Sequence, residues 1–86
     1  MKVRREVSWF SGRVEKKLRV NDFKGGWRRE QPLRLYQKLQ NELYELYRSF
    51  GMGTNGEIID ECADVAAFAM MIADNVHRRR NGKVPR

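Results

Sequence analysis

The stretch from Asn41 to Val65, NELYELYRSFGMGTNGEIIDECADV, decides the fold of this chain of 86 residues. It has the pattern of the end of one amphipathic helix, a glycine-rich turn and the start of a second helix. A turn this short makes the two helices antiparallel neighbours. Acidic residues stand in the apolar stripe of each helix, where an unpaired charge is costly to bury. We therefore expect a helical hairpin with carboxylates gathered between its helices.

The composition is that of a small globular protein, with 34% charged and 41% hydrophobic residues. A chain of this length buries only a modest core, and association with other chains is a common remedy. The single cysteine, Cys62, and the single histidine, His77, exclude an internal disulfide and a closed zinc site within one chain. There is neither a long apolar run nor a secretory signal pattern, so we expect a cytoplasmic protein without a membrane span.

The net charge of +7 is unevenly distributed along the chain. Basic residues concentrate near both ends, whereas residues 49–76 contain no lysine or arginine and five acids. A strongly basic protein is expected to meet an anionic partner. Nucleic acid, a phosphorylated small molecule and an acidic surface all satisfy this expectation.

The hydrophobic pattern predicts three helices, at about residues 4–20, 32–50 and 55–80, and no strand, so the fold class is all-α. Pro32 suits the first turn of the second helix, and Gly51 suits its C-terminal cap. Thr54 and Glu57 have the spacing of a capping box at the start of the third helix. Gly82 and Pro85 are expected to end this helix, which leaves residues 81–86 as a disordered basic tail.

The third predicted helix is apolar nearly all round over residues 63–73, ADVAAFAMMIA. Such a helix must be covered on more than one side. One long and one shorter helix do not cover it easily, so we expect a second subunit to do so. The prediction is a helical hairpin plus an N-terminal helix, assembled into a dimeric or tetrameric bundle. A compact monomeric three-helix bundle is the alternative.

Two apolar stripes contain carboxylates at core-type positions. In the second helix the stripe is Leu35, Leu39, Glu42 and Leu46, and in the third it is Ile58, Glu61, Val65, Phe68 and Ile72. A further acid, Glu45 or Asp64, follows three residues after the first acid of each stripe. Because the helices are antiparallel, the two pairs are expected to face each other at one level.

Four carboxylates brought together repel one another unless a cation lies between them. Mg²⁺ and Mn²⁺ prefer oxygen ligands, and Mg²⁺ often combines a few carboxylates with substrate phosphate oxygens. We therefore predict a metal site formed by Glu42, Glu45, Glu61 and Asp64. Di-iron bundles also use interhelical carboxylates, but their Glu-x-x-His pattern is missing. The competing interpretation is a set of surface acids paired with lysines and arginines.

The pattern Glu42-x-x-Glu45, a spacer, then Glu61-x-x-Asp64 resembles the signature of the MazG-like all-α nucleoside triphosphate pyrophosphohydrolases. The flanking segments LQNELYELY, EIIDECADVAAFAMMIADN and KLRVNDFKGGW resemble small phage and prokaryotic members. The resemblance covers about residues 16–75, and the length of the chain predicts a single domain over residues 1–86. Asn41 is a departure, because many family members have an acid at that position.

The resemblance implies Mg²⁺-dependent hydrolysis of an NTP or dNTP to the monophosphate and pyrophosphate, by dimers or tetramers with sites at or near subunit interfaces. Glu45 is our choice of general base. We also name four substrate-binding candidates, three of them with a structural alternative. Lys38 would meet a phosphate or pair with Glu42, and Lys24 would contact phosphate from a loop. Trp27 would stack on a base or pack on the hairpin, and Asn75 would touch sugar or base or be a surface polar residue.

The runner-up hypothesis is a non-enzymatic basic helical dimer that binds nucleic acid or senses nucleotides. It accounts for the basic charge and for the terminal arginine clusters. Asn41, which replaces an acid of the family pattern, is compatible with a nucleotide sensor that has no catalytic activity. It does not explain the acids in the apolar stripes, so nucleic acid ranks below a nucleotide as the expected partner.

Overall fold

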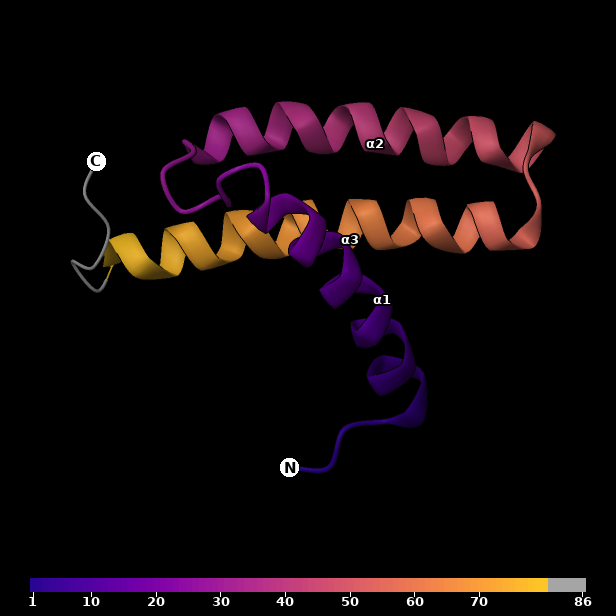
Figure 1. Cartoon of the computed structure of the whole chain (residues 1–86), viewed down its shortest axis with the longest axis horizontal. Helices are drawn as coiled ribbons and strands as arrows, with labels where there is room; N and C mark the ends of the chain where they lie inside the picture. Colours follow the sequence, from indigo (N-terminus) through magenta and orange to yellow (C-terminus); the bar gives the residue numbers. More distant parts are fainter. Residues whose placement is uncertain (81–86) are drawn as a thin grey trace.

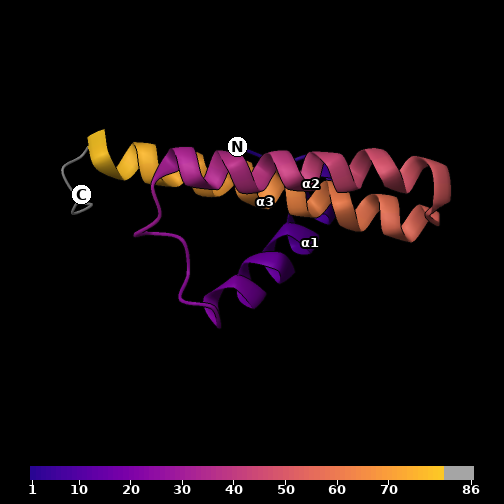
Figure 2. The same ribbon diagram turned by 90° about the horizontal axis from the view of Figure 1, so that it is seen from above.

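The computed structural model describes residues 1–80, which form three helices and no strand. These are α1 (Arg5–Asp22), α2 (Pro32–Met52) and α3 (Asn55–Arg80). Helices α2 and α3 lie side by side and antiparallel, forming a long hairpin (Figures 1 and 2). The expected all-α class and the helical hairpin with an additional N-terminal helix are therefore confirmed. Among the described helices, none combines the length and the hydropathy needed to cross a bilayer.

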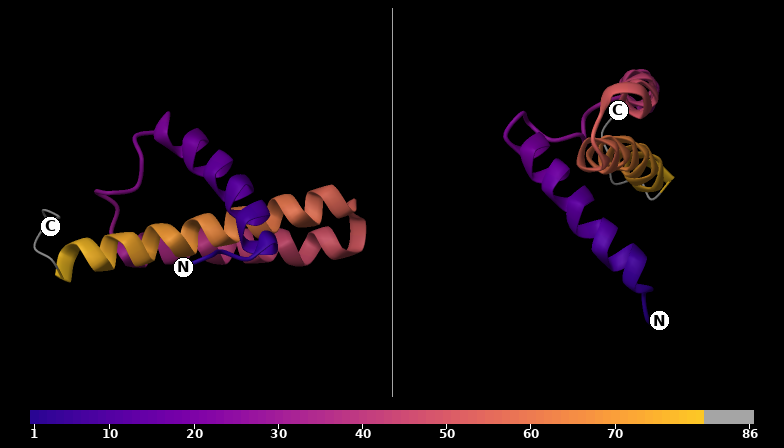
Figure 3. Two further views of the ribbon diagram at one scale, coloured as in Figure 1. Left: turned by 90° about the horizontal axis from the view of Figure 1, so that it is seen from below. Right: turned by 90° about the vertical axis from the view of Figure 1, so that its right-hand side faces the viewer.

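Helix α1 packs on α3 and, within the described residues, makes no packing contact with α2. It crosses the hairpin steeply, and its N-terminal half leads away from it (Figures 1 and 3). None of its residues is fully buried. Val14 and Leu18, one turn apart, are the α1 side chains that pack on the core, as expected for one helix face. The N-terminal helix is thus held by a small contact area.

The core lies between α2 and α3, in the part of the hairpin where α1 packs on α3. Leu35 of α2 and Ala67 and Met71 of α3 are its buried residues. Ala63, one turn before Ala67, is also fully buried. Small side chains at these two positions allow α2 and α3 to approach closely along the hairpin. The predicted interior stripes are confirmed, since their leucines are buried or half-buried and Glu42 and Glu61 are half-buried.

The connection between α2 and α3 differs from the prediction at one residue. The Glu57 N–H donates to Thr54 Oγ1 at 3.2 Å, which confirms the predicted N-cap of α3. Helix α2, however, continues through Gly51 to Met52, and its C-cap is Gly53, whose N–H donates to Ser49 O at 2.8 Å. The assignment of Gly51 as the cap was wrong because Gly53 offers the same chemistry two residues later. The predicted stops at Gly82 and Pro85 and the predicted tail 81–86 lie outside the described residues.

The connector between α1 and α2, residues 23–31, is held by hydrogen bonds at both ends. Gly25 (φ 100°) and Gly26 (φ 75°) occupy the left-handed region, which glycine adopts without strain. This turn lets the Gly26 N–H donate to Asn21 O at 3.0 Å. Further along, Asn75 Nδ2 donates to Trp27 O at 2.8 Å and to Glu30 O at 3.0 Å. The connector is therefore held against α3 by a buried side chain.

Candidate metal centre and its pocket

Three of the four predicted metal ligands come together between α2 and α3. Glu42 from α2 and Glu61 and Asp64 from α3 each place one carboxylate oxygen within 4.8 Å of the others. The hairpin produces this cluster because Glu42 precedes the turn by about as many residues as Asp64 follows it, and Glu61 lies one turn of α3 before Asp64. All three side chains are half-buried, so water screens their mutual repulsion only in part.

The electrostatics of this cluster favour a cation. Burial raises the pKa of Glu42 above its ordinary value, and the charges of Asp64 and Glu61 raise it further. Burial also raises the pKa of Glu61, with the charges of Asp64 and Asp60 adding to the shift. Glu61 Oε2 is buried and has no hydrogen-bond partner among the described residues. A divalent cation with oxygen ligands fits this donor set, since it would relieve the repulsion and satisfy that oxygen.

Glu45, the fourth predicted ligand and the predicted general base, is not part of this cluster. Its side chain is exposed and lines a separate recess of about 340 Å³ with Arg48, Glu57, Asp60 and Glu61. Its charge still raises the pKa values of Glu42 and Glu61, so it lies near them. The expectation that all four acids face one another at one level therefore holds for three of them.

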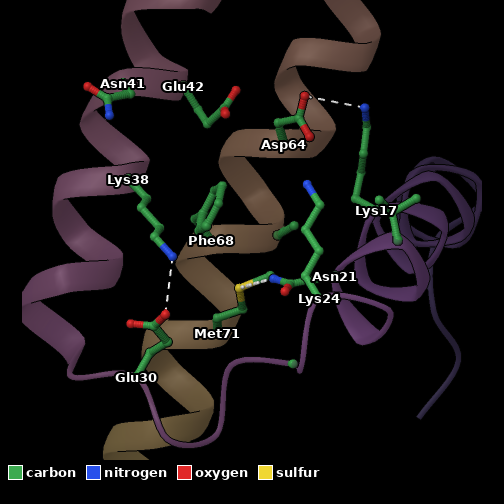
Figure 4. Close-up of a pocket in the computed structure, with 13 residues that line it drawn as sticks. Lys17, Asn21, Lys24, Glu30, Lys38, Asn41, Glu42, Asp64, Phe68 and Met71 are labelled. Atoms are coloured by element: carbon green, nitrogen blue, oxygen red, sulfur yellow. Dashed lines mark hydrogen bonds and ion pairs between the residues drawn. The ribbon is translucent and has the colours of Figure 1, made fainter.

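A pocket of about 450 Å³ opens beside the cluster, between α1, the connector and the hairpin. Its wall combines two of the acids with cationic, amide and apolar side chains: Lys17, Asn21, Lys24, Lys38, Asn41, Glu42, Asp64, Phe68 and Met71 (Figure 4). Counting Glu30, three acids and three lysines line it, so the pocket offers partners to both anions and cations. The volume is in the range of small-molecule sites.

The two lysines named from the sequence both line this pocket. Lys24 runs from the connector into it, and Lys38 enters from α2 (Figure 4). Lys38 Nζ lies 3.2 Å from Glu30 Oε1, so its partner is Glu30 and not Glu42. Asn41 also lines the pocket, beside Glu42. The residue that departs from the family pattern therefore faces the same space as the candidate ligands.

Trp27 packs beside the core instead of lining this pocket. It is half-buried against the Leu35–Ala67–Met71 cluster, and its Nε1 donates to Asp74 Oδ2 at 3.0 Å. Burial raises the pKa of Asp74, but the hydrogen bonds from Arg78 and Trp27 outweigh it and leave the pKa below its ordinary value. The structure thus favours the packing alternative for Trp27 over base stacking.

Asn75 is fully buried, which corrects the expectation that it touches the substrate or lies on the surface. Both hydrogens of its amide are used on the connector carbonyls, and the residue does not line the pocket. Its spacing after Asp64 did place it on the hairpin-facing side of α3. The connector occupies that position, and the sequence pattern carries no signal for such a long-range contact.

Lys17 is the site residue that the sequence interpretation missed. Its Nζ lies 2.8 Å from Asp60 Oδ2 and 3.3 Å from Asp64 Oδ2 (Figure 4 shows the Asp64 contact). Burial lowers the Lys17 pKa, but the bonds and charges of Asp60 and Asp64 outweigh burial and raise it. A signal was available, because Lys17 continues the helical face of Phe10 and Val14 at i+7 and i+3.

Comparisons with family models, with curated proteins and with solved structures found no match. The fold and the site describe an all-α hairpin protein with an interhelical carboxylate cluster at the edge of a pocket lined by three lysines and three acids.

Proposed function

We propose that this chain is a divalent-cation-dependent nucleoside triphosphate pyrophosphohydrolase that uses Mg²⁺, with Mn²⁺ as an alternative. The observation that carries the proposal is the juxtaposition of three clustered carboxylates with a lysine-lined pocket of nucleotide size. A metal bound by a few carboxylates and substrate phosphate oxygens is the usual arrangement for Mg²⁺ in phosphoryl chemistry. The resemblance of the acidic pattern to the MazG-like enzymes adds support from the sequence.

The reaction breaks the bridge between the α- and β-phosphates of an NTP or dNTP. Water adds to one phosphorus, and the products are the monophosphate and pyrophosphate. When bound, the divalent cation would neutralise phosphate charge and lower the pKa of the attacking water. Glu42, Glu61 and Asp64 would hold the cation, because they are the acids that the fold brings together.

The remaining pocket residues are assigned by their chemistry. Lys24 and Lys38 would hold phosphate oxygens, since both ammonium groups reach the pocket. Phe68, which is half-buried, supplies the apolar surface on which a ribose or a base would pack. Glu45 stays a predicted base whose carboxylate approaches from the neighbouring recess. Glu61, which lines that recess and belongs to the cluster, connects the two spaces.

The proposal is tested with purified protein and a panel of NTPs and dNTPs, with and without Mg²⁺, by measuring monophosphate and pyrophosphate. We expect Mg²⁺-dependent release of both products in equal amounts. Glu61→Gln should lower the rate by on the order of 100-fold or more, since even outer-shell partners of metal ligands cost 10- to 100-fold. Glu15→Gln, an exposed acid of α1 paired with Arg19, is the matched control and should keep full activity. No pyrophosphate from any nucleotide, at saturating metal, would refute the proposal.

We further propose that the active form is a homodimer or homotetramer. Three observations support this. Helix α1 has no fully buried residue, and α3 exposes Ala69, Ala73 and Val76, the last at 43%. On α2, Phe50 is exposed at 67%. A second copy of the chain is the expected cover for these apolar positions. Light scattering coupled to size-exclusion chromatography tests this, and a mass of 10.2 kDa at micromolar concentration would contradict it.

The outer face of α1 provides one observation in favour of the alternative, nucleic-acid binding. Trp9 is 54% exposed, and the Arg13 guanidinium carbon lies 5.1 Å from its ring centroid. Arg5 and Lys16 share this face, so a stripe of cations surrounds an aromatic platform. Binding of a fluorescent single strand should then weaken steeply between 50 and 200 mM salt. Trp9→Ala should weaken it further. Absent or salt-independent binding would exclude this function.

A further inference from the structure

Lys17 links the N-terminal helix to the carboxylate cluster. Its ammonium bridges Asp60, at 2.8 Å, and Asp64, at 3.3 Å. The Asp64 side chain is 25% exposed and belongs to the cluster, whereas the Asp60 side chain is 56% exposed and lies outside it. One of the two partners of Lys17 is therefore a proposed metal ligand, and the other is a more exposed acid.

Lys17 differs from the other cations of its segment in where it points. Arg13, Lys16 and Arg19 are exposed on the outer side of α1, while Lys17 is half-buried and lines the pocket. Lys24 and Lys38 line the same pocket, but neither has an ion pair with an acid of the cluster among the described residues; Lys38 pairs with Glu30. Lys17 is thus the pocket lysine placed to compete with a metal for a carboxylate and to reach an anion beside it.

The geometry points to Lys17 as the resident counter-cation of the cluster, which exchanges its hold on Asp64 for a phosphate of the substrate. This inference rests on the proposed function. In the structure the ammonium neutralises part of the charge of Asp64. When Asp64 serves as a metal ligand, Lys17 is released toward the pocket, where a polyanion supplies new partners. Lys17 would then bind the substrate and would also compete with the metal for Asp64.

The exchange makes two predictions of opposite sign for Lys17→Met, which keeps the length of the stem and removes the charge. Without a polyanion, the affinity for Mn²⁺ should rise about tenfold, because Asp64 no longer has a competing partner and a positive charge has left the site. With Mn²⁺ present, the affinity for inorganic tripolyphosphate should fall about tenfold, because one charge-assisted bond is lost. A residue that only supported the fold would lower both affinities.

The experiment measures Mn²⁺ binding by electron paramagnetic resonance and binding of the Mn²⁺–tripolyphosphate complex by calorimetry. Lys16→Met is the matched control, since it removes the neighbouring exposed charge of the same helix and should change neither affinity by more than about twofold. Asp60→Asn is the second control. It weakens the attachment of α1 to α3 but leaves the Lys17 charge at the cluster, so tripolyphosphate affinity should stay within about threefold of wild type.

Three results would overturn the inference. One is an unchanged or lowered Mn²⁺ affinity in Lys17→Met, and another is an unchanged affinity for the tripolyphosphate complex. The third is Asp60→Asn reproducing the effects of Lys17→Met, which would assign them to loosening of α1. If the wild-type protein hydrolyses nucleotides and Lys17→Met has wild-type affinities for Mn²⁺ and for the tripolyphosphate complex, only the role of Lys17 is refuted. Wild-type protein that binds no Mn²⁺ and hydrolyses nothing refutes the proposed function together with this inference.

Discussion

The substitution Asn75→Ala tests the interior contact that holds the connector over the pocket. Asn75 is fully buried, and its amide donates two hydrogen bonds, of 2.8 and 3.0 Å, to the carbonyls of Trp27 and Glu30. Each such bond contributes about 1 kcal/mol net, so losing both costs about 2 kcal/mol. Leaving two carbonyls without their donor raises the cost toward about 4 kcal/mol. That is a large part of the stability of a small domain.

The assay is urea unfolding followed by circular dichroism, with the wild type and the variant at equal concentration. We expect the transition midpoint to fall while the slope stays constant, because the surface exposed on unfolding is nearly unchanged. Gln31→Ala is the matched control. It removes a 2.7 Å bond between the same connector and α3, from Arg79 to Gln31, but at an exposed position. Its cost should stay within about 0.5 kcal/mol, as for most surface changes.

The same variant separates anchoring of the connector from contact with substrate. If Asn75 acts only through the connector, Asn75→Ala should raise KM for the nucleotide more than it lowers kcat, since Lys24 and Glu30 would lose their fixed positions. A cost below about 0.5 kcal/mol for Asn75→Ala would refute the reasoning, because two hydrogen bonds from a buried amide cannot be lost so cheaply.

Three further predictions concern the cluster and the hairpin turn. Burial and neighbouring acids raise the pKa values of Glu42 and Glu61, so the folded state binds their protons more tightly than the unfolded chain. Without metal, the free energy of unfolding should therefore rise as the pH falls from 7 toward the ordinary carboxyl pKa of 4.5. Urea midpoints across this range measure the rise, and Glu61→Gln should flatten it; a rise of equal size in the variant would contradict the assignment. Glu45→Gln should change Mn²⁺ affinity by less than about threefold, whereas Glu42→Gln should lower it by on the order of 100-fold, since only Glu42 belongs to the cluster. Equal losses in a Mn²⁺ titration would restore Glu45 as a ligand. Gly51→Ala should stabilise the protein by up to about 1 kcal/mol, because Gly51 is helical and its added Cβ meets nothing within 4 Å. Gly53→Ala should instead cost about 1 to 3 kcal/mol, because its Cβ would lie 2.8 Å from Ser49 O; thermal melts of the two variants should move in opposite directions.

Much of the fold was predictable because helix signals are local. The apolar periodicity, Pro32 at the start of α2 and the Thr54 cap are properties of short segments, and the structure confirms each of them. The wrong prediction of Gly51 as the C-cap of α2 also has a local cause, since Gly51 and Gly53 lie two residues apart and both suit a helix cap. The chain uses Gly53, whose N–H reaches Ser49 O.

The candidate site was predictable only as far as the hairpin determines it. Glu42, Glu61 and Asp64 meet because a short turn fixes the register of two antiparallel helices, and that register can be counted along the sequence. Glu45 did not join them, although Glu61 and Asp64, which have the same spacing of three residues, both did. Its exposed side chain lines the neighbouring recess instead.

The sequence by itself determined three helices, one hairpin and a set of acids at core-type positions. Only the tertiary structure decided what stands opposite those acids. Lys17 reaches Asp64 from a helix 47 residues earlier, and Asn75 holds a connector whose carbonyls lie 45 and 48 residues earlier. Helix periodicity tells which way a side chain faces, but the crossing of α1 over α3 and the path of the connector follow from packing of the whole chain. For that reason the local patterns predicted the carboxylate cluster, whereas the cation beside it emerged from the fold.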